Sequence, residues 1–126
     1  MKTPINTINF NIEYSEKYTI IVIRVIGETK YETSDQYDTN EFDEYCVLYS
    51  IVDMLKAISP TDTVLDFICD SEDTKELIQQ VLEINKTAAD SLWRYQNELY
   101  EDFEDWVILN TLLKTNTIIT RVLETN

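Results

Sequence analysis

The sequence contains no histidine, a single glycine and only two cysteines among its 126 residues. The absence of histidine excludes catalytic triads built on an imidazole base and zinc sites with histidine ligands. The two cysteines, Cys46 and Cys69, both lie in apolar segments. This placement favours buried free thiols in a reducing compartment, and the alternative is a disulfide or a metal-binding pair.

Long apolar runs are also missing. The run YTIIVIRVI at residues 18–26 is about half as long as the roughly 18 apolar residues that a membrane span needs. The first ten residues lack the apolar stretch and the small-residue cleavage site of a secretory signal. We therefore expect a cytosolic chain without membrane contact. Its 44% apolar content predicts one compact domain over residues 1–126.

Basic residues are scarce, since ten lysines and arginines stand against 24 aspartates and glutamates, for a formal net charge of −14. Such a negative surface repels phosphate backbones, which disfavours non-specific binding of nucleic acid. Two interpretations of the charge remain open. One is a solvated acidic surface, and the other is an acidic face that binds a basic partner.

Alternating apolar and polar residues predict strands near the N-terminus. Ile8, Phe10 and Ile12 alternate with polar neighbours, which is the period of a strand with one face in the core. The β-branched run that follows predicts a second strand. Gly27 lies where a turn would lead into a third strand, within residues 28–34. Together these segments predict an antiparallel meander.

An amphipathic helix is predicted after this meander. Thr39 or Asn40 can serve as its N-cap, and Asp43 then complements the positive end of the helix. An apolar stripe repeats at intervals of three and four residues, as a buried helix face requires. The stripe consists of Tyr45, Leu48, Val52 and Leu55. The helix is expected to end before Pro60.

The second half of the sequence continues with strand and helix patterns. Residues 63–70 (TVLDFICD) predict a strand, and the helix that follows has Asp70 or Ser71 as its natural cap. A longer helical pattern covers about residues 88–114, and residues 116–123 predict a last strand. The order βββαβααβ predicts a mixed five-stranded sheet with helices packed on its faces, of the α/β (α+β) class.

Three segments in this order resemble the ribonuclease H-like fold. A Thr-Asn pair at residues 39–40, followed by Glu44 and an apolar helix, is similar to the family's first-helix signature with its metal-binding glutamate. Residues 64–78 (VLDFICDSEDTKELI) resemble the strand that ends in an aspartate-serine pair, which places Asp70. The last nine residues, IITRVLETN, resemble the family's last strand.

The resemblance implies a nuclease in which several carboxylates hold two divalent cations, usually magnesium, that activate water and stabilise charge on the phosphate. Glu44 and Asp70 match two of the four carboxylate positions. At the first-strand position the sequence offers Asn11, an amide, or Glu13, two residues farther along the same face. With Glu13, three carboxylates are expected to converge. The candidate catalytic residues are then Glu13, Glu44 and Asp70, and the metal ligands, for magnesium or manganese, are Glu44 and Asp70.

The sequence departs from the family's pattern at three further places. Residues 15–17 (SEK) stand where the family has a glycine-rich turn that lets a nucleic-acid backbone approach closely. The sequence ends at Asn126, before the helix that would supply the family's final aspartate. The histidine-bearing loop of many members has no counterpart. These departures, together with the charge, favour a non-catalytic protein without a bound cofactor.

The segment NELYEDFEDW at residues 97–106 is a second candidate site. Its carboxylates share one predicted helix with three aromatic residues. The candidate partner-binding residues are Glu98, Glu101, Asp102, Glu104 and Asp105. Such an array can imitate phosphate spacing and bind arginines of a basic, nucleic-acid-binding protein through charge-assisted contacts. The alternative is a solvated helix face.

These features predict a non-catalytic acidic binding protein, a nucleic-acid mimic that inhibits a nucleic-acid-processing enzyme and does not itself bind nucleic acid. In charge and size alone, the chain resembles phage-encoded inhibitors of the anti-restriction and anti-CRISPR type. The alternative is a magnesium-dependent ribonuclease H-like nuclease that cleaves RNA–DNA hybrids. A third hypothesis is an assembly subunit that associates through the aromatic residues around Trp93 and Trp106.

Overall fold

The computed structural model describes residues 4–27, 29–87 and 103–124. Within them, five strands form one mixed sheet in the order β3-β2-β1-β4-β5. The strands are β1 (Ile5–Tyr14), β2 (Tyr18–Ile26), β3 (Tyr31–Asp38), β4 (Thr63–Cys69) and β5 (Ile118–Glu124). The first three pair antiparallel, whereas β4 pairs parallel to both β1 and β5. The structure confirms the predicted mixed five-stranded sheet.

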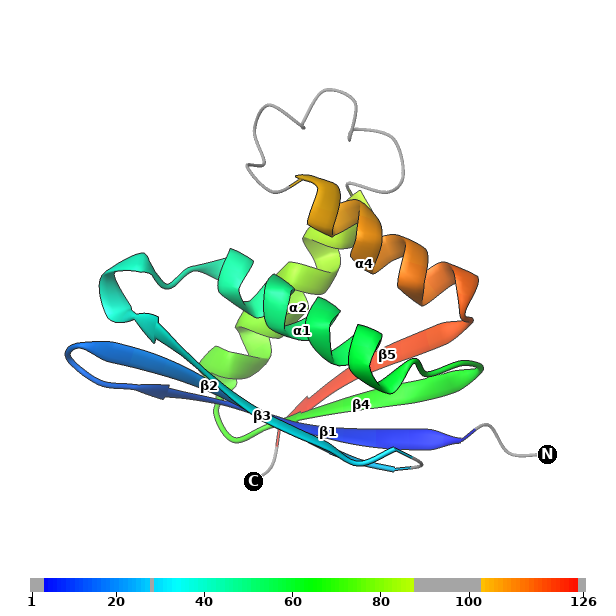
Figure 1. Cartoon of the computed structure of the whole chain (residues 1–126), viewed down its shortest axis with the longest axis horizontal. Helices are drawn as coiled ribbons and strands as arrows, with labels where there is room; N and C mark the ends of the chain where they lie inside the picture. Colours follow the sequence, from blue (N-terminus) through cyan, green and yellow to red (C-terminus); the bar gives the residue numbers. More distant parts are fainter. Residues whose placement is uncertain (1–3, 28, 88–102, 125–126) are drawn as a thin grey trace.

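The described helices are α1 (Glu44–Ile58), α2 (Glu72–Thr87) and α4 (Phe103–Thr115), and all lie on the same side of the sheet (Figure 1). One hydrophobic core fills the space between the helices and the sheet. At its centre, the Phe10 and Phe67 rings contact each other with centroids 6.4 Å apart. None of the helices in the described ranges is long and apolar enough to cross a membrane.

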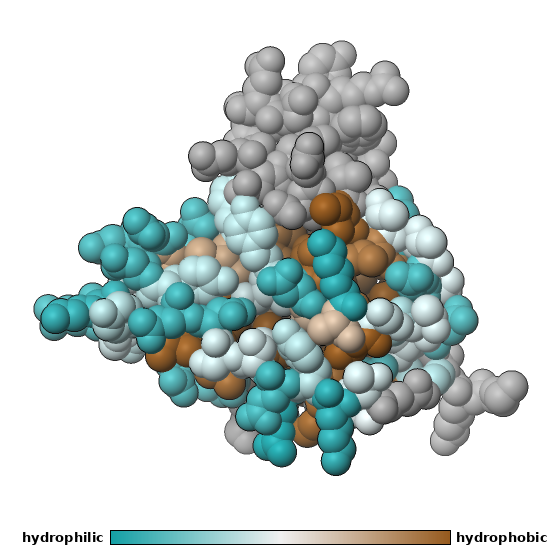
Figure 2. All heavy atoms as spheres, viewed as in Figure 1, coloured by the Kyte–Doolittle hydropathy of each residue, from teal (hydrophilic) through white to brown (hydrophobic). Residues whose placement is uncertain are grey.

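The two faces of the sheet follow the predicted alternation. In β1, Ile8 and Phe10 are fully buried under the helices, whereas Asn9 and Asn11 point to the opposite, open face and are half-buried. The open face also carries large hydrophobic side chains that are 43–58% exposed. These are Ile5, Tyr18, Ile26, Ile119 and Leu123. Figure 2 shows hydrophobic residues at the surface over the sheet, between hydrophilic neighbours.

The first helix begins later than predicted. Thr39 and Asn40 lie in a three-residue 3-10 helix, and neither caps α1. The N-cap is Asp43, whose carboxylate accepts a hydrogen bond of 3.0 Å from a backbone N–H of the first turn, so α1 starts at Glu44. The Thr39 hydroxyl is used elsewhere, because it donates to the carbonyl oxygen of Ser15 at 2.9 Å.

The other helix ends agree with the sequence patterns more closely. Ser59 takes a left-handed conformation (φ 45°) and ends α1 directly before Pro60, as predicted. Of the two caps considered for α2, Asp70 and Ser71, the structure selects Ser71. Its hydroxyl accepts a hydrogen bond of 3.2 Å from the backbone N–H of Thr74.

Two element boundaries differ from the sequence-based expectation. Strand β3 covers Tyr31–Asp38 instead of 28–34, because its pairing with β2 extends until Asp38 lies opposite Tyr18. Of the long helix predicted for residues 88–114, the structure describes α4, and residues 88–102 lie outside the described residues.

Both cysteines are free and buried, which confirms the expectation of unpaired core thiols. Burial, assisted by the negative charge of Asp70, raises the pKa of Cys69 to about 11. Burial also raises the pKa of Cys46. Since the thiolate is the reactive and metal-binding form, both side chains act as small hydrophobic core residues at neutral pH.

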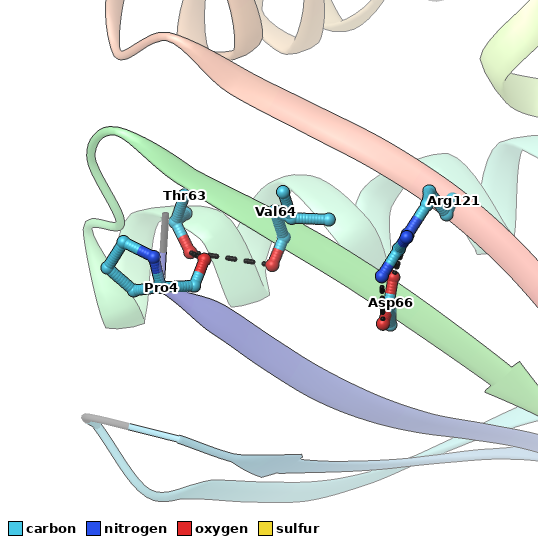
Figure 3. A network of polar contacts seen from close by, with 5 residues as sticks. All are labelled: Pro4, Thr63, Val64, Asp66 and Arg121. Carbon is cyan, nitrogen blue, oxygen red and sulfur yellow. Dashed lines mark hydrogen bonds and ion pairs between the residues drawn. The ribbon is translucent and has the colours of Figure 1, made fainter. Parts of the chain in front are cut away.

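A polar network at the start of β1 and β4 fixes how these two parallel strands are aligned (Figure 3). The buried Thr63 hydroxyl donates to the carbonyl oxygen of Pro4 at 2.9 Å and accepts from Nδ2 of Asn6 at 2.9 Å. A Cβ atom at Gly27 would overlap the Asn6 side chain, so the glycine is required for this close approach. The candidate site at the other end of the strands depends on this alignment.

Candidate functional site

The carboxyl ends of β1 and β4 meet at one edge of the sheet. Their parallel register pairs Phe10 with Cys69, so the next residues, Asn11 and Asp70, are neighbours. With its amide oriented to satisfy both acceptors, the Asn11 nitrogen donates to Oδ1 of Asp70 at 3.2 Å and to the carbonyl oxygen of Phe10 at 3.0 Å. The structure therefore brings an amide, and not a second carboxylate, beside Asp70.

The start of α1 reaches the same edge. The Phe42 ring contacts Tyr14, near the end of β1, with ring centroids 5.9 Å apart and perpendicular planes. It also contacts Tyr37 of β3 at 6.0 Å. Glu44 follows two residues later as the first residue of α1 and is half-buried. A carboxylate at this position is favoured by the positive end of the helix.

The first turn of α2 is the third segment at this edge. Burial raises the pKa of Tyr14, and the negative charge of Asp73 in that turn raises it further. Asp73 is thus close enough to Tyr14 for its charge to act on the phenol. The edge is therefore built by the end of β1, the start of α1 and the β4–α2 junction, where Asp70 and Asp73 lie together with Lys75, whose positive charge acts on Cys69.

The three carboxylates predicted to converge here, Glu13, Glu44 and Asp70, come from three different elements. Glu13 lies on the same face of β1 as Asn11 but two residues farther along the strand. It pairs with Ile20 of β2 and is exposed. Among the residues with described positions, no group of three or more acidic or thiol side chains is close enough to hold a metal ion. Glu13, Glu44 and Asp70 therefore do not form the expected three-carboxylate cluster, and the neighbour of Asp70 is Asn11.

The residues at this edge fit one hard cation better than two. Magnesium prefers oxygen ligands and is commonly held by one or two carboxylates together with phosphate oxygens of the substrate. Glu44 and Asp70 carry donors of this kind, whereas Asn11 presents its amide nitrogen to Asp70. A two-cation site needs more carboxylates to balance the second charge, and an amide at residue 11 does not supply one. Whether Glu44 and Asp70 bind a metal remains a prediction.

The acidic segment at residues 97–106 is covered only in part. Glu98, Glu101 and Asp102 lie outside the described residues, as does Trp93. Glu104 and Asp105 lie within the described part of α4. The role of these five carboxylates in binding a partner remains a prediction.

Sequence reasoning missed a charged pair in the sheet. Asp66 of β4 is 8% exposed and receives two hydrogen bonds from Arg121 of β5, Nε to Oδ1 at 2.6 Å and Nη2 to Oδ2 at 2.8 Å (Figure 3). The hydrogen bonds and the negative charge of Asp66 raise the pKa of Arg121. An aspartate inside the apolar run TVLDFIC was the available signal. The pair joins two strands and lies on the open face.

Comparison with solved structures identifies the fold. A foamy viral protease–reverse transcriptase, solved in complex with double-stranded DNA, matches with a TM-score of 0.55 and 10% identity over 98% of this chain and 83% of that one. Ribonuclease H1 of Halobacterium salinarum matches with a TM-score of 0.51 and 13% identity over 96% of this chain and 85% of that one. The chain has a ribonuclease H-like fold.

Sequence comparison adds no closer relationship. No protein-family model matches the chain, and no curated protein matches it in sequence. Structural similarity at 10–13% sequence identity establishes the fold, and the function has to be inferred from the residues of the site.

Proposed function

We propose that the chain is a magnesium-dependent ribonuclease H-like nuclease acting on RNA–DNA hybrids, with its site where β1, α1 and β4 meet. The observation that supports this proposal is the placement of Asn11 and Asp70 side by side at the carboxyl edge of a ribonuclease H-like sheet. The start of α1, with Glu44, reaches the same edge. A bound magnesium ion would activate water and neutralise charge on the scissile phosphate.

The three side chains have distinct roles in this proposal. Asp70 and Glu44 supply the two negative charges that hold the cation next to a substrate phosphate. Asn11 orients Asp70, because its amide donates to Oδ1 of that carboxylate. Since an amide adds no charge, we expect weak metal binding and slow hydrolysis compared with a site that has a third carboxylate.

The test is cleavage of an end-labelled RNA–DNA hybrid by the purified chain at saturating magnesium or manganese. Asp70→Asn should abolish cleavage, whereas Asp53→Asn, which removes the same charge from an exposed position on α1, should leave it unchanged. Asn11→Asp should raise the affinity for manganese by about tenfold, because a carboxylate binds a hard cation more strongly than an amide. Absence of cleavage in both the parent chain and Asn11→Asp rules the nuclease out.

A second candidate function is supported by the same amide and by the charge. A neutral residue beside Asp70 and a net charge of −14 also suit a non-catalytic protein that binds a basic, nucleic-acid-binding protein and inhibits it. Neutralising Glu101, Asp102 and Asp105 together should then abolish inhibition of that partner. Neutralising Asp53, Glu72 and Glu76, which are exposed on α1 and α2, removes equal charge and should not. Equal losses in the two triple variants would exclude a specific acidic site.

A further inference from the structure

Strand β3 lies at one edge of the sheet and pairs on one side only, with β2. Thr39 donates its backbone N–H to the carbonyl oxygen of Lys17 at 3.0 Å, and this bond continues the β2–β3 ladder. In an antiparallel ladder, residues that bond the neighbouring strand alternate with residues whose backbone groups point away from it. The alternation therefore directs the backbone groups of four residues of β3 out of the sheet. These are Glu32, Ser34, Gln36 and Asp38.

This outer row of backbone groups is regular and accessible. All four residues are exposed, and among the described parts of the chain no strand lies on the outer side of β3. The register with β2 runs from Tyr31 to Asp38 without a bulge, and this stretch contains neither proline nor lysine. Bulges, prolines and lysines are the usual devices that prevent a further strand from pairing with an edge. Since β3 has none of them, its outer backbone groups can bond another strand.

We propose that β3 pairs with β3 of a second copy of this chain, antiparallel about a twofold axis at Ser34, so that the two sheets become continuous. The charges of the strand favour this register. It places Asp38 of each copy opposite Lys30 of the other, which gives two pairs of opposite charge on the open face. The remaining carboxylates of the strand lie opposite uncharged residues, Glu32 opposite Gln36 and Asp35 opposite Thr33.

The tyrosines of β3 are complementary in the same register. Tyr31 and Tyr37 are half-buried on the covered face and pack against the core. Tyr31 of one copy lies opposite Tyr37 of the other, in a pair without backbone hydrogen bonds, where side chains of facing strands are closest. Cross-strand aromatic pairs of this kind stabilise a sheet. The contact is made twice, because a twofold interface uses the same surface of both copies.

Neighbouring registers are less favourable for the same strand. A twofold axis at Asp35 would place the two copies of that carboxylate together and Glu32 opposite Asp38, and like charges directly opposite each other are destabilising. A twofold axis at Thr33 would move Asp38 past Lys30 and remove both pairs of opposite charge. The interface goes beyond the proposed nuclease, because it involves neither the carboxyl edge of β1 and β4 nor a metal ion.

Cysteine crosslinking of the full chain tests the register. The Cα atoms of a hydrogen-bonded antiparallel pair are about 5.5 Å apart, within the range of about 4.4–6.8 Å that a disulfide spans. Ser34→Cys should therefore form a disulfide-linked dimer with oxidised glutathione, seen on a non-reducing gel. Gln36→Cys, equally exposed on β3, should not, because four residues of strand, about 14 Å, would separate its two copies. The native cysteines are buried. Equal crosslinking of the two variants, or none in Ser34→Cys, would overturn the proposed pairing.

An exchange of charges tests the complementary pairs. Light scattering of the full chain, at about 0.15 M salt to screen repulsion between the acidic surfaces, should give twice the monomer mass. Lys30→Asp and Asp38→Lys each place like charges opposite each other twice and should weaken dimerisation by about tenfold or more.

The variant with both substitutions restores opposite charges and should restore the dimer. Glu76→Lys, a charge reversal at an exposed position on α2, is the control and should leave the dimer unchanged. A monomeric parent chain, or a double variant that dimerises no better than the single variants, would overturn the proposal. None of these measurements depends on nuclease activity.

Discussion

The two faces of the sheet are built from the same five strands and yet have different environments. On the covered face, side chains such as Ile8, Phe10 and Phe67 have no exposed surface. On the open face, Ile26 and Ile119 are also β-branched and hydrophobic but remain 50% and 58% exposed. Alternation along a strand therefore assigns each residue to one face of the sheet, and the packing of the helices determines which face becomes the core.

The two faces of the sheet also differ in the charged residues that they carry. The covered face contributes mostly hydrophobic side chains to one cluster with α1, α2 and α4. The open face holds Asp66 at 8% exposure, and this burial is tolerated because Arg121 satisfies both carboxylate oxygens. Asn11 also lies on the open face of the sheet.

The largest effect that distinguishes the two faces is expected for Phe67→Ala. Phe67 is fully buried and contacts Phe10, and truncation of a buried phenylalanine costs about 3–5 kcal/mol of unfolding free energy. Urea denaturation followed by circular dichroism measures the loss. A change below about 1 kcal/mol would contradict a tightly packed covered face.

A pH-dependent effect is expected from Cys69, which also lies on the covered face. Its pKa is raised from the ordinary value of 9.0 to about 11, mainly by burial. Between these values the unfolded chain has lost the thiol proton while the folded chain retains it, so stability falls as pH rises from about 9 to 11 and is unaffected below 9.

The comparison of the parent chain with Cys69→Ala isolates this effect. Tyr14 and Tyr37 also have raised pKa values, mainly because of burial, but they contribute equally to both proteins. The urea midpoint of the parent should therefore fall more steeply between pH 8 and 11 than that of the variant. Parallel curves would show that the thiol is not held protonated in the folded state.

A smaller loss is expected on the open face for Arg121→Gln. The substitution leaves the Asp66 carboxylate at 8% exposure without its cation, which lowers stability. Lys114→Gln, an exposed residue in the last turn of α4, removes the same charge and serves as the control. Equal urea midpoints for the two variants would mean that the pair contributes nothing beyond net charge.

The smallest effect is expected for Ile119→Ser. Ile119 is 58% exposed on the open face of β5, and exposed substitutions of this kind usually change stability by no more than about 0.5 kcal/mol. The same urea experiment measures it. A loss approaching that of Phe67→Ala would mean that the open face is covered in solution, and the contrast between the faces would then disappear.

Most of the fold follows from local patterns in the sequence. The period of two in Ile8, Phe10 and Ile12 identified both the strand and its buried face, because neighbouring side chains of a strand must point to opposite sides. The break at Pro60 ended α1 for an equally local reason, since proline disfavours helical geometry in the residue before it.

The tertiary structure decided what the sequence left open. Asn11 rather than Glu13 lies beside Asp70 because the register of the parallel strands β1 and β4 is set by contacts between distant segments, including Asn6 with Thr63. Asp43 caps α1 through its carboxylate, whereas the hydroxyl of Thr39 donates to Ser15 in a separate contact.

The contact between Asp66 and Arg121 joins residues 55 positions apart. Periodicity reports the environment of a residue relative to its neighbours along the chain, whereas the partners of a side chain depend on which strands become adjacent. That choice is made by packing of the whole sheet against its helices.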